Sequence, residues 1–221
     1  MNVEQARFNM IEQQIRPWEV LDQGVLSLLA VVKREDFVPP AYRSLAFVDT
    51  EVPLRDGGAN GQSMLAPKVE ARLLQDLQVA RHEQVLEIGA GSGHMAALLA
   101  HKAQQVTSFE VVPELAGFAQ ANLRRAAVMN ARVVAGDGSR GLPEQAPFDV
   151  IVLPGSVASV PQHLLDQLKV GGRLAAIVGF EPVMRATLVT RVGEHEYRSV
   201  ELFDTVAPRL LGFEEPSRFT F

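Results

Sequence analysis

The sequence has 221 residues, of which 47% are apolar and 21% charged, with a formal net charge of −5 and a pI near 5.6. This composition excludes a disordered chain, and an acidic balance without a basic run argues against nucleic-acid binding. The absence of cysteine excludes disulfides and cysteine-based nucleophiles or metal sites, and the five histidines lack ligand-pair spacing, so we expect no metal site and a reducing, cytoplasmic location.

The first 66 residues predict a helical and loop appendage to a core of residues 67–221, together forming a single domain. Apolar residues recur at helical spacing on one face of a first helix, which Arg16-Pro17 ends: Val3, Ala6, Met10, Ile11 and Ile15. A second helix begins with Asp22 as N-cap, stops near residues 37–40 and faces inward with Val25, Leu26, Leu28, Leu29 and Val32. These helices serve either to cover the sheet or to bind substrate. Residues 1–16 contain no secretory apolar region, and the longest apolar run, residues 25–32, is too short to span a bilayer.

Residues 54–67 form the most irregular stretch of the chain. Asp56, Gly57, Gly58, Ala59, Asn60 and Gly61 follow one another, which is compatible with neither helix nor strand. We expect a substrate-facing lid here, with a simple linker as the alternative. A helix follows with Pro67 in its first turn and with apolar positions at Val69, Leu73, Leu74 and Leu77.

Residues 84–100 predict a strand, a glycine turn and a helix. The apolar run Val85, Leu86 and Ile88 is typical of a strand buried on both faces. Gly89, Gly91 and Gly93 let a ligand approach the backbone, and the free N–H groups at the helix start favour polar or anionic atoms. The dinucleotide fingerprint needs a glycine where His94 stands, which disfavours a nicotinamide cofactor. The alternating glycines, with Glu87 before them, resemble motif I of the S-adenosylmethionine-dependent methyltransferases. A purely structural turn is the alternative.

The remaining chain alternates strands and helices. A strand over residues 106–110 ends in Glu110, about 20 residues after the turn, where a carboxylate can accept both ribose hydroxyls or simply face solvent. Further elements are expected as a helix from residue 113 to about 129 with Leu115, Phe118 and Leu123 inward, strands 132–135 and 148–153, a short helix 161–168, and a strand 173–178 after the turn Gly171-Gly172. This order predicts an α/β fold with a doubly wound parallel sheet. Residues 186–192 and 197–206 predict a hairpin that adds an antiparallel edge.

Motifs along nearly the whole chain resemble the protein-L-isoaspartate (D-aspartate) O-methyltransferases. They are Gln14-Ile15-Arg16, Arg34-Glu35-Asp36-Phe37-Val38-Pro39, Leu45-Ala46-Phe47-Val48-Asp49, Gly61-Gln62-Ser63, residues 85–93, Gly136-Asp137-Gly138-Ser139, Ala146-Pro147-Phe148-Asp149 and residues 167–174. The resemblance implies a Rossmann-like sheet and methylation of the α-carboxylate of L-isoaspartyl residues in a damaged protein or peptide.

The same resemblance implies S-adenosyl-L-methionine as cofactor and a set of residues that bind it. Gly89 and Gly91 are expected under its methionine and ribose part, Glu110 on the ribose hydroxyls, and Asp137 with Gly138 beside the adenine. The full set of cofactor-binding residues is Glu87, Gly89, Gly91, Gly93, Glu110, Val111, Asp137 and Gly138.

The family's loop reads Gly-Gln-Thr-Ile-Ser-Gln/Ala-Pro, and its serine is usually assigned as the active-site residue. This chain has Leu65 at that position. An isoaspartyl carboxylate is already ionised at neutral pH, so transfer needs no general base and Leu65 is compatible with weakened catalysis. Ser63 should face the same space as Leu65 in an extended segment and partly replace the hydroxyl, or else cap the helix at Pro67. Two alternatives stay open: a different, small-molecule acceptor, or a cofactor-binding protein that has lost catalysis.

Overall fold

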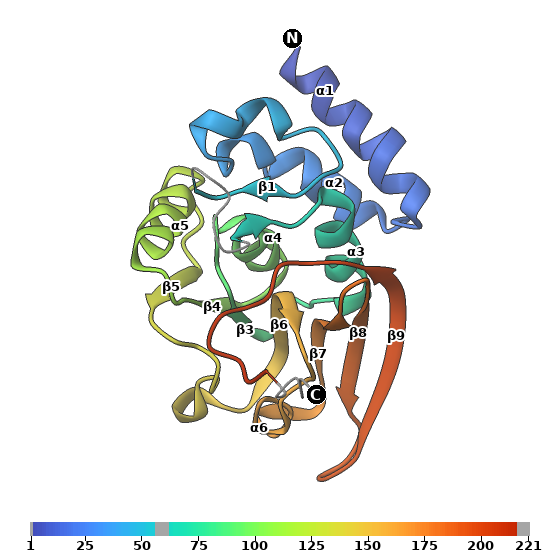
Figure 1. Ribbon diagram of the computed structural model, residues 1–221, viewed down its shortest axis with the longest axis vertical. Coiled ribbons are helices and arrows are strands. Elements are labelled where there is room, and N and C mark those ends of the chain that lie inside the picture. Colours follow the sequence, from blue (N-terminus) through green and yellow to red (C-terminus); the bar gives the residue numbers. More distant parts are fainter. Residues whose placement is uncertain (1, 56–61, 216–221) are drawn as a thin grey trace, which may run out of the picture.

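The structure is a computed structural model that describes residues 2–55 and 62–215. Its main sheet consists of β3 (Gln84–Ile88), β4 (Gln105–Glu110), β5 (Ala131–Ala135), β6 (Phe148–Val157), β7 (Leu168–Phe180), β8 (Val183–Arg191) and β9 (Tyr197–Thr205). The strand order is β5-β4-β3-β6-β7-β8-β9 (Figure 1). The first five strands in this order are parallel, β8 pairs antiparallel with β7, and β9 pairs antiparallel with β8. The predicted α/β sheet with an antiparallel C-terminal edge is therefore confirmed.

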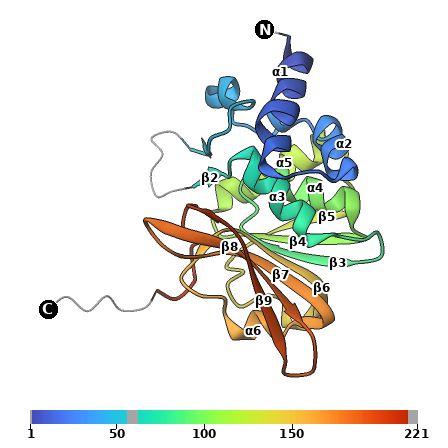
Figure 2. The ribbon, with the colours of Figure 1, turned by 90° about the vertical axis from the view of Figure 1, so that its right-hand side faces the viewer.

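The helices are distributed unequally over the two faces of the sheet. They are α1 (Val3–Asn9), α2 (Gln23–Val31), α3 (Pro67–Leu77), α4 (His94–Lys102), α5 (Pro113–Arg125) and α6 (Gln162–Leu165). Figure 2 shows α1 to α5 over one face and the four-residue α6 on the other. On this second face, apolar side chains of α6 and of the chain after β9, including Leu210 and Phe213, pack against the sheet. The sheet is thus wound on both sides, but only one side carries long helices.

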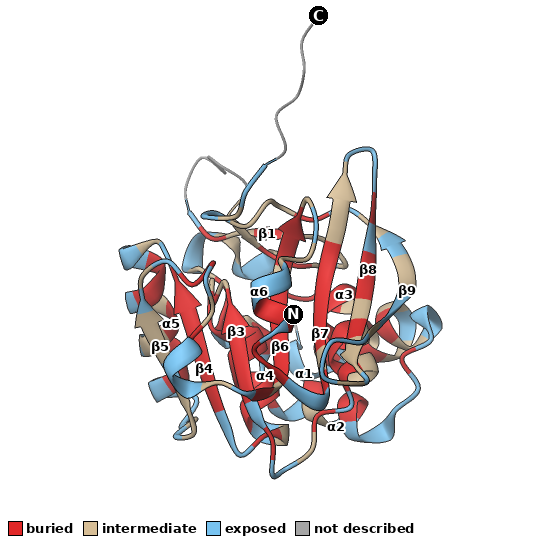
Figure 3. Cartoon of the chain, turned by 90° about the horizontal axis from the view of Figure 1, so that it is seen from below, coloured by how far each residue is buried: buried red, intermediate tan, exposed pale blue. Residues whose placement is uncertain are grey.

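The hydrophobic core lies along the central strands of the sheet. Buried residues concentrate on β3, β4, β6 and β7, whereas β9 is largely exposed (Figure 3). Strands covered on both faces need apolar side chains on both, as the run in β3 indicated. One apolar cluster extends from Met10 to Ala207 and includes residues of the N-terminal appendage. The appendage therefore shares the apolar core of the sheet.

The N-terminal region agrees with the sequence prediction in its helices but not in every boundary. The first helical run continues from α1 through a π-helical segment, Met10–Ile15, and a 3₁₀ turn, Arg16–Trp18. Asp22 caps α2 as predicted, its Oδ1 accepting the Val25 N–H at 2.9 Å. The helix stops at Val31, earlier than expected, and is followed by 3₁₀ turns at Arg34–Asp36 and Pro40–Leu45. Two residue pairs join β1 (Val52–Pro53) to β2 (Ser63–Met64). Of the predicted lid at residues 54–67, residues 56–61 lie outside the described residues.

Several predicted boundaries in the core were wrong. Strand β6 extends to Val157 rather than residue 153, and β8 begins at Val183 rather than residue 186. Helix α5 ends at Arg125 because Ala127 is left-handed and its neighbour Val128 donates back to the Leu123 carbonyl, a helix-ending pattern. Helix α6 ends at Leu165, and β7 already begins at Leu168. The pair Gly171-Gly172 lies inside β7 rather than before it, in an irregular stretch of its pairing with β6. A Cβ at Gly172 would lie 2.9 Å from the Lys169 carbonyl oxygen, which explains the glycine there.

Among the described residues, no helix is long and apolar enough to cross a membrane.

Candidate active site

A cavity lies where the parallel strands β3, β4 and β6 end, the usual ligand position in such sheets. Its volume is about 80 Å³. Five of the eight predicted cofactor-binding residues line it: Gly89, Gly91, Glu110, Val111 and Gly138. The loops after three successive strands, β3, β4 and β5, therefore bring together residues as far apart in sequence as Gly89 and Gly138.

Glu110 has the geometry expected of a ribose acceptor. Its Oε2 accepts the Gly91 N–H at 2.8 Å, and its Oε1 accepts the Val112 N–H at 3.0 Å. Each carboxylate oxygen offers two lone-pair directions, so one on each oxygen is left after these bonds. The two backbone donors fix the carboxylate at the end of β4, and its free acceptor directions suit two neighbouring hydroxyl groups.

The three glycines of the turn have different tasks. Gly89 and Gly91 are left-handed, with φ of 110° and 54°, and both form the cavity wall. Gly93 is also left-handed but lies away from the wall, where a Cβ would be 3.1 Å from the Ala119 carbonyl oxygen of α5. Gly93 thus allows α5 to pack closely against the start of α4 and supports the site indirectly.

Glu87 and Asp137 lie outside the central cavity. Glu87 is fully buried in β3, where the Ser108 hydroxyl donates to its Oε2 at 2.5 Å and its Oε1 has no partner among the described residues. Burial raises the pKa of Glu87 to about 8, so the side chain is mostly protonated at neutral pH. Asp137 accepts the Ser139 N–H at 2.8 Å and lines a wider neighbouring groove of about 840 Å³. The structure therefore does not place either carboxyl group on the central cavity wall.

A smaller cavity of about 30 Å³ adjoins the first and contains both candidate catalytic positions. Ser63 and Leu65 line it together, as their spacing predicted. The Ser63 hydroxyl donates to Glu51 Oε2 at 3.0 Å. Helix α3 has Ala66 at its N-cap and no side-chain capping bond, so the alternative that Ser63 caps this helix was wrong. Burial raises the pKa of Glu51, while the bond from Ser63 opposes that rise.

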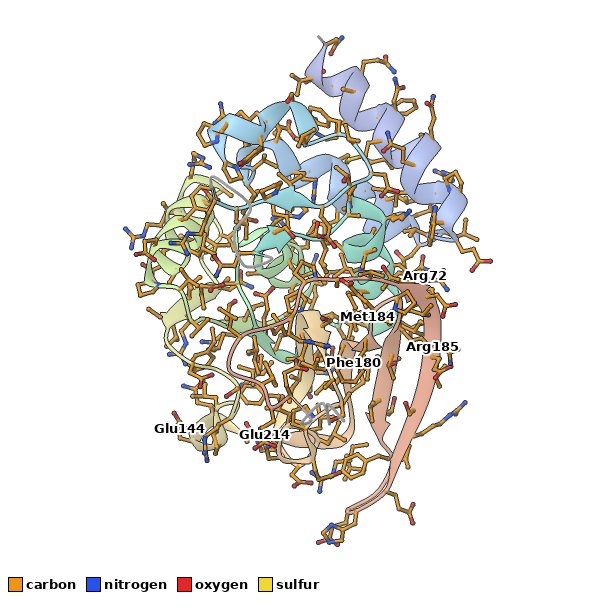
Figure 4. The ribbon with its side chains drawn as sticks, in the orientation of Figure 1. Arg72, Glu144, Phe180, Met184, Arg185 and Glu214 are labelled. Carbon is orange, nitrogen blue, oxygen red and sulfur yellow. The ribbon has the colours of Figure 1, made fainter. Side chains whose placement is uncertain are left out.

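Sequence reasoning missed the segment that follows β9. This segment runs back across the carboxyl end of β6 (Figure 1). There the backbone N–H of Ser156 donates to the Pro208 carbonyl at 2.7 Å, and the backbone carbonyl of Ser156 accepts from the Leu210 N–H at 2.9 Å. Arg209 packs over the ring of Phe180, labelled in Figure 4, at 5.1 Å. Leu210 reaches the glycine turn: a Cβ built at Gly89 would lie 2.8 Å from its Cδ2. No periodicity in residues 206–215 signals this contact.

Pro154 and Gly155 on β6 were also missed, although a signal for them existed. Both line the central cavity and follow directly after the buried residues 150–153. Because ligands in open parallel sheets bind at the carboxyl ends of strands, the Pro-Gly pair after the predicted strand 148–153 could have been included.

Comparison with known proteins gives a consistent family. The profile of the family Protein-L-isoaspartate(D-aspartate) O-methyltransferase matches residues 5–204. A protein-L-isoaspartate O-methyltransferase of Methanoculleus marisnigri is 42% identical over 173 residues, covering 78% of this chain and 77% of the relative. Protein-L-isoaspartate O-methyltransferase 2 of Pelobacter propionicus is 39% identical over 214 residues, covering 96% of this chain and 93% of the relative.

A solved structure shares the fold. It is described as a protein-L-isoaspartate O-methyltransferase from Plasmodium falciparum in complex with S-adenosyl-L-homocysteine, and it superposes with a TM-score of 0.79 over 92% of this chain and 97% of its own. Its sequence is only 20% identical, so this likeness concerns the fold. Taken with the profile match and the two relatives, these findings show that the chain belongs to the protein-L-isoaspartate (D-aspartate) O-methyltransferase family.

Proposed function

We propose that this protein is an S-adenosylmethionine-dependent methyltransferase that methylates the α-carboxylate of L-isoaspartyl residues in damaged proteins or peptides. Membership of the family supports both the reaction and the class of substrate. The anchored Glu110 carboxylate is the single observation that best supports the cofactor, because its geometry suits a ribose and its position follows the glycine turn. The absence of cysteine agrees with a reducing cytoplasm as the place of action.

The residues of the cavity fit this cofactor in several respects. Glu110 supplies acceptors for the ribose, and the side chains of Ile88 and Phe109 supply apolar surface for a base. Gly138 keeps its backbone close to this surface, since a Cβ there would lie 2.5 Å from Phe109 Cβ. Leu210 covers the glycine turn from the opposite side. We infer that the chain after β9 moves aside to admit the cofactor and then encloses it.

The chemistry requires little of the protein beyond positioning. When bound, the cofactor would supply a methyl group on a sulfonium sulfur. A carboxylate oxygen can attack this methyl carbon and displace the sulfur as a neutral thioether, without a general base. Holding acceptor oxygen, methyl carbon and sulfur in line can contribute roughly 7–11 kcal/mol through proximity. The small cavity beside Ser63 and Leu65 is formed largely by buried residues, among them Met64 and Met95. Leu65 leaves this wall without the family's hydroxyl but does not remove the positioning function.

The test is transfer of a radiolabelled methyl group to an isoaspartyl peptide and to its normal aspartyl twin. We expect base-labile label on the isoaspartyl peptide alone. Glu110→Gln serves as a control with an impaired cofactor site and should give much less label. If the wild type binds the cofactor but labels neither peptide, the proposed acceptor is wrong.

A further inference from the structure

One buried carboxylate lines the small cavity and has no part in the mechanism so far. Glu70, in the first turn of α3, is only 4% exposed. The backbone of the glycine turn, residues 89–92, lines the same cavity. Among the described residues on this wall, Glu70 is the one charged side chain. An anionic group therefore lies beside the turn that carries the proposed cofactor.

Two cationic or hydrogen-bonding partners hold this carboxylate in a fixed position. Arg34, itself buried, forms an ion pair with Glu70 Oε2, and His94 Nδ1 lies 2.9 Å from the same oxygen. Burial alone raises the pKa of Glu70, but the nearby Arg34 and His94 outweigh burial and lower it. Glu70 is therefore ionised at neutral pH. Arg34 also donates to the Leu65 carbonyl at 2.7 Å, which connects the group to the loop before α3.

Stability alone is a poor explanation for this arrangement. Removing two charges from water costs several kcal/mol for each ion, and well-packed apolar residues often stabilise a core at least as well. The site is also fully inside the fold, where an apolar residue at position 70 would pack beside the buried Leu73 and Leu74 of the same helix. A buried ionised carboxylate on a cavity wall instead suits a ligand with positive charge.

The position of the cavity indicates which part of the cofactor reaches it. Gly91 forms part of both cavity walls, and its N–H group binds Glu110, which we assign to the ribose. The part of the cofactor beyond the ribose is its amino-acid end, which carries an α-ammonium and an α-carboxylate. A volume of about 30 Å³ holds one small polar group. The charge of Glu70 attracts the ammonium and repels the cofactor carboxylate.

We propose that Glu70 binds the α-ammonium group of the cofactor and that Arg34 and His94 orient its carboxylate for this contact. The inference rests on the proposed cofactor. It assigns to Glu70 a direct binding role, and to Arg34 and His94 positioning roles, since neither of these lines the cavity.

Calorimetric binding of three ligands tests the proposal without measuring turnover. S-adenosylhomocysteine carries the ammonium, its deaminated analogue lacks only that group, and 5′-methylthioadenosine lacks the whole amino-acid end. In the wild type, the deaminated analogue should bind roughly 10- to 100-fold more weakly than S-adenosylhomocysteine, the range of one charge-assisted hydrogen bond. Glu70→Gln should weaken S-adenosylhomocysteine by a similar factor and leave 5′-methylthioadenosine unchanged.

Glu83→Gln is the matched control variant. Glu83 is also a buried carboxylate, and it pairs with Arg173 at 2.5 Å, but it lines neither cavity. This variant should leave the affinity for all three ligands unchanged. Equal weakening of S-adenosylhomocysteine and 5′-methylthioadenosine by Glu70→Gln would mean that Glu70 only supports the fold.

The wild-type comparison can refute the proposal even if Glu70→Gln does not fold. Equal affinity of the wild type for S-adenosylhomocysteine and its deaminated analogue would overturn the ammonium contact. Failure of all three ligands to bind would instead contradict the proposed function. The two failures are thus distinguishable.

Discussion

Glu87 should make the stability of this protein depend on pH in a direction opposite to that of an ordinary paired carboxylate. Burial, with smaller contributions from the charges of Glu70 and Glu110, raises its pKa from 4.5 to about 8, while the Ser108 hydroxyl opposes the rise. The folded protein therefore binds one more proton than the unfolded chain between about pH 4.5 and pH 8. The stabilisation from this proton is complete below the lower value and is lost as the pH rises through the upper one.

Substituting Glu87→Gln removes this titration and keeps the shape of the side chain. At roughly 1.4 kcal/mol for each pKa unit, the rise corresponds to a change on the order of 4 kcal/mol between the two pH limits. We expect the free energy of unfolding of the wild type, relative to that of Glu87→Gln, to fall by up to this amount from about pH 5 to about pH 9. Urea unfolding followed by circular dichroism at several pH values measures it.

Glu83 provides the comparison for this experiment. The pKa of Glu83 is lowered: burial would raise it, but the hydrogen bond from Arg173 and other contacts outweigh that effect. The contribution of ionised Glu83 to the free energy of unfolding is present above the ordinary carboxyl pKa and is lost only on acidification. Relative to the wild type, Glu83→Gln should therefore be destabilised by a constant amount from about pH 6 to pH 9. Parallel stability curves for the wild type and Glu87→Gln over the same range would refute the assignment of a neutral, buried Glu87.

Three further predictions concern the cavity. Leu65→Ser should exceed Leu65→Ala in turnover on isoaspartyl peptide by about 10- to 100-fold, since both variants lose the same buried apolar contacts and only serine adds a hydroxyl hydrogen bond; equal rates would show that a hydroxyl has no role there. Glu110→Gln should weaken cofactor binding by at least about 10-fold in calorimetry, because an amide has one acceptor oxygen for two backbone donors and two hydroxyls. An unchanged affinity would contradict the ribose assignment. Leu210→Ala should raise the association rate constant of the cofactor in stopped-flow fluorescence, because Leu210 covers Gly89; slower association would instead make Leu210 part of the binding surface.

Local sequence signals identified the elements that form the cofactor side of the site. The strand before Gly89, the glycine turn and the acid at the end of the next strand are each defined within a few residues by sterics and apolar patterning. Asp22 was predictable as a cap for the same reason, since it needs only its own helix. Parallel strands place their carboxyl ends at one edge, so the meeting of Gly91 with Glu110 followed from the order of the elements.

Boundaries that depend on packing were less predictable. Helix α5 stops at Arg125 although alanine, valine and methionine continue to residue 129, because the chain must turn there into β5. Gly171-Gly172 resembles a turn in sequence but lies inside β7. Gly171 is left-handed, with φ of 87°, and a Cβ at Gly172 would crowd the backbone carbonyl oxygens of Lys169, Asp149 and Phe148. The last two belong to the neighbouring strand β6, which no local pattern reveals.

Which of the buried carboxyl groups is neutral and which is ion-paired was decided by the tertiary structure alone. Glu87, Glu110 and Glu70 are the same residue type in sequence, yet the structure makes the first neutral, anchors the second with two backbone donors and pairs the third with Arg34. Arg34 and Glu70 are 36 residues apart, and no local pattern joins them. The order of strands and helices indicated the fold, because apolar patterning is a short-range property, and the resemblance of the glycine turn to methyltransferase motif I implied the cofactor. Burial and distant partners set what each carboxylate can do, because the energy of a charge depends on its surroundings rather than on its place in the chain.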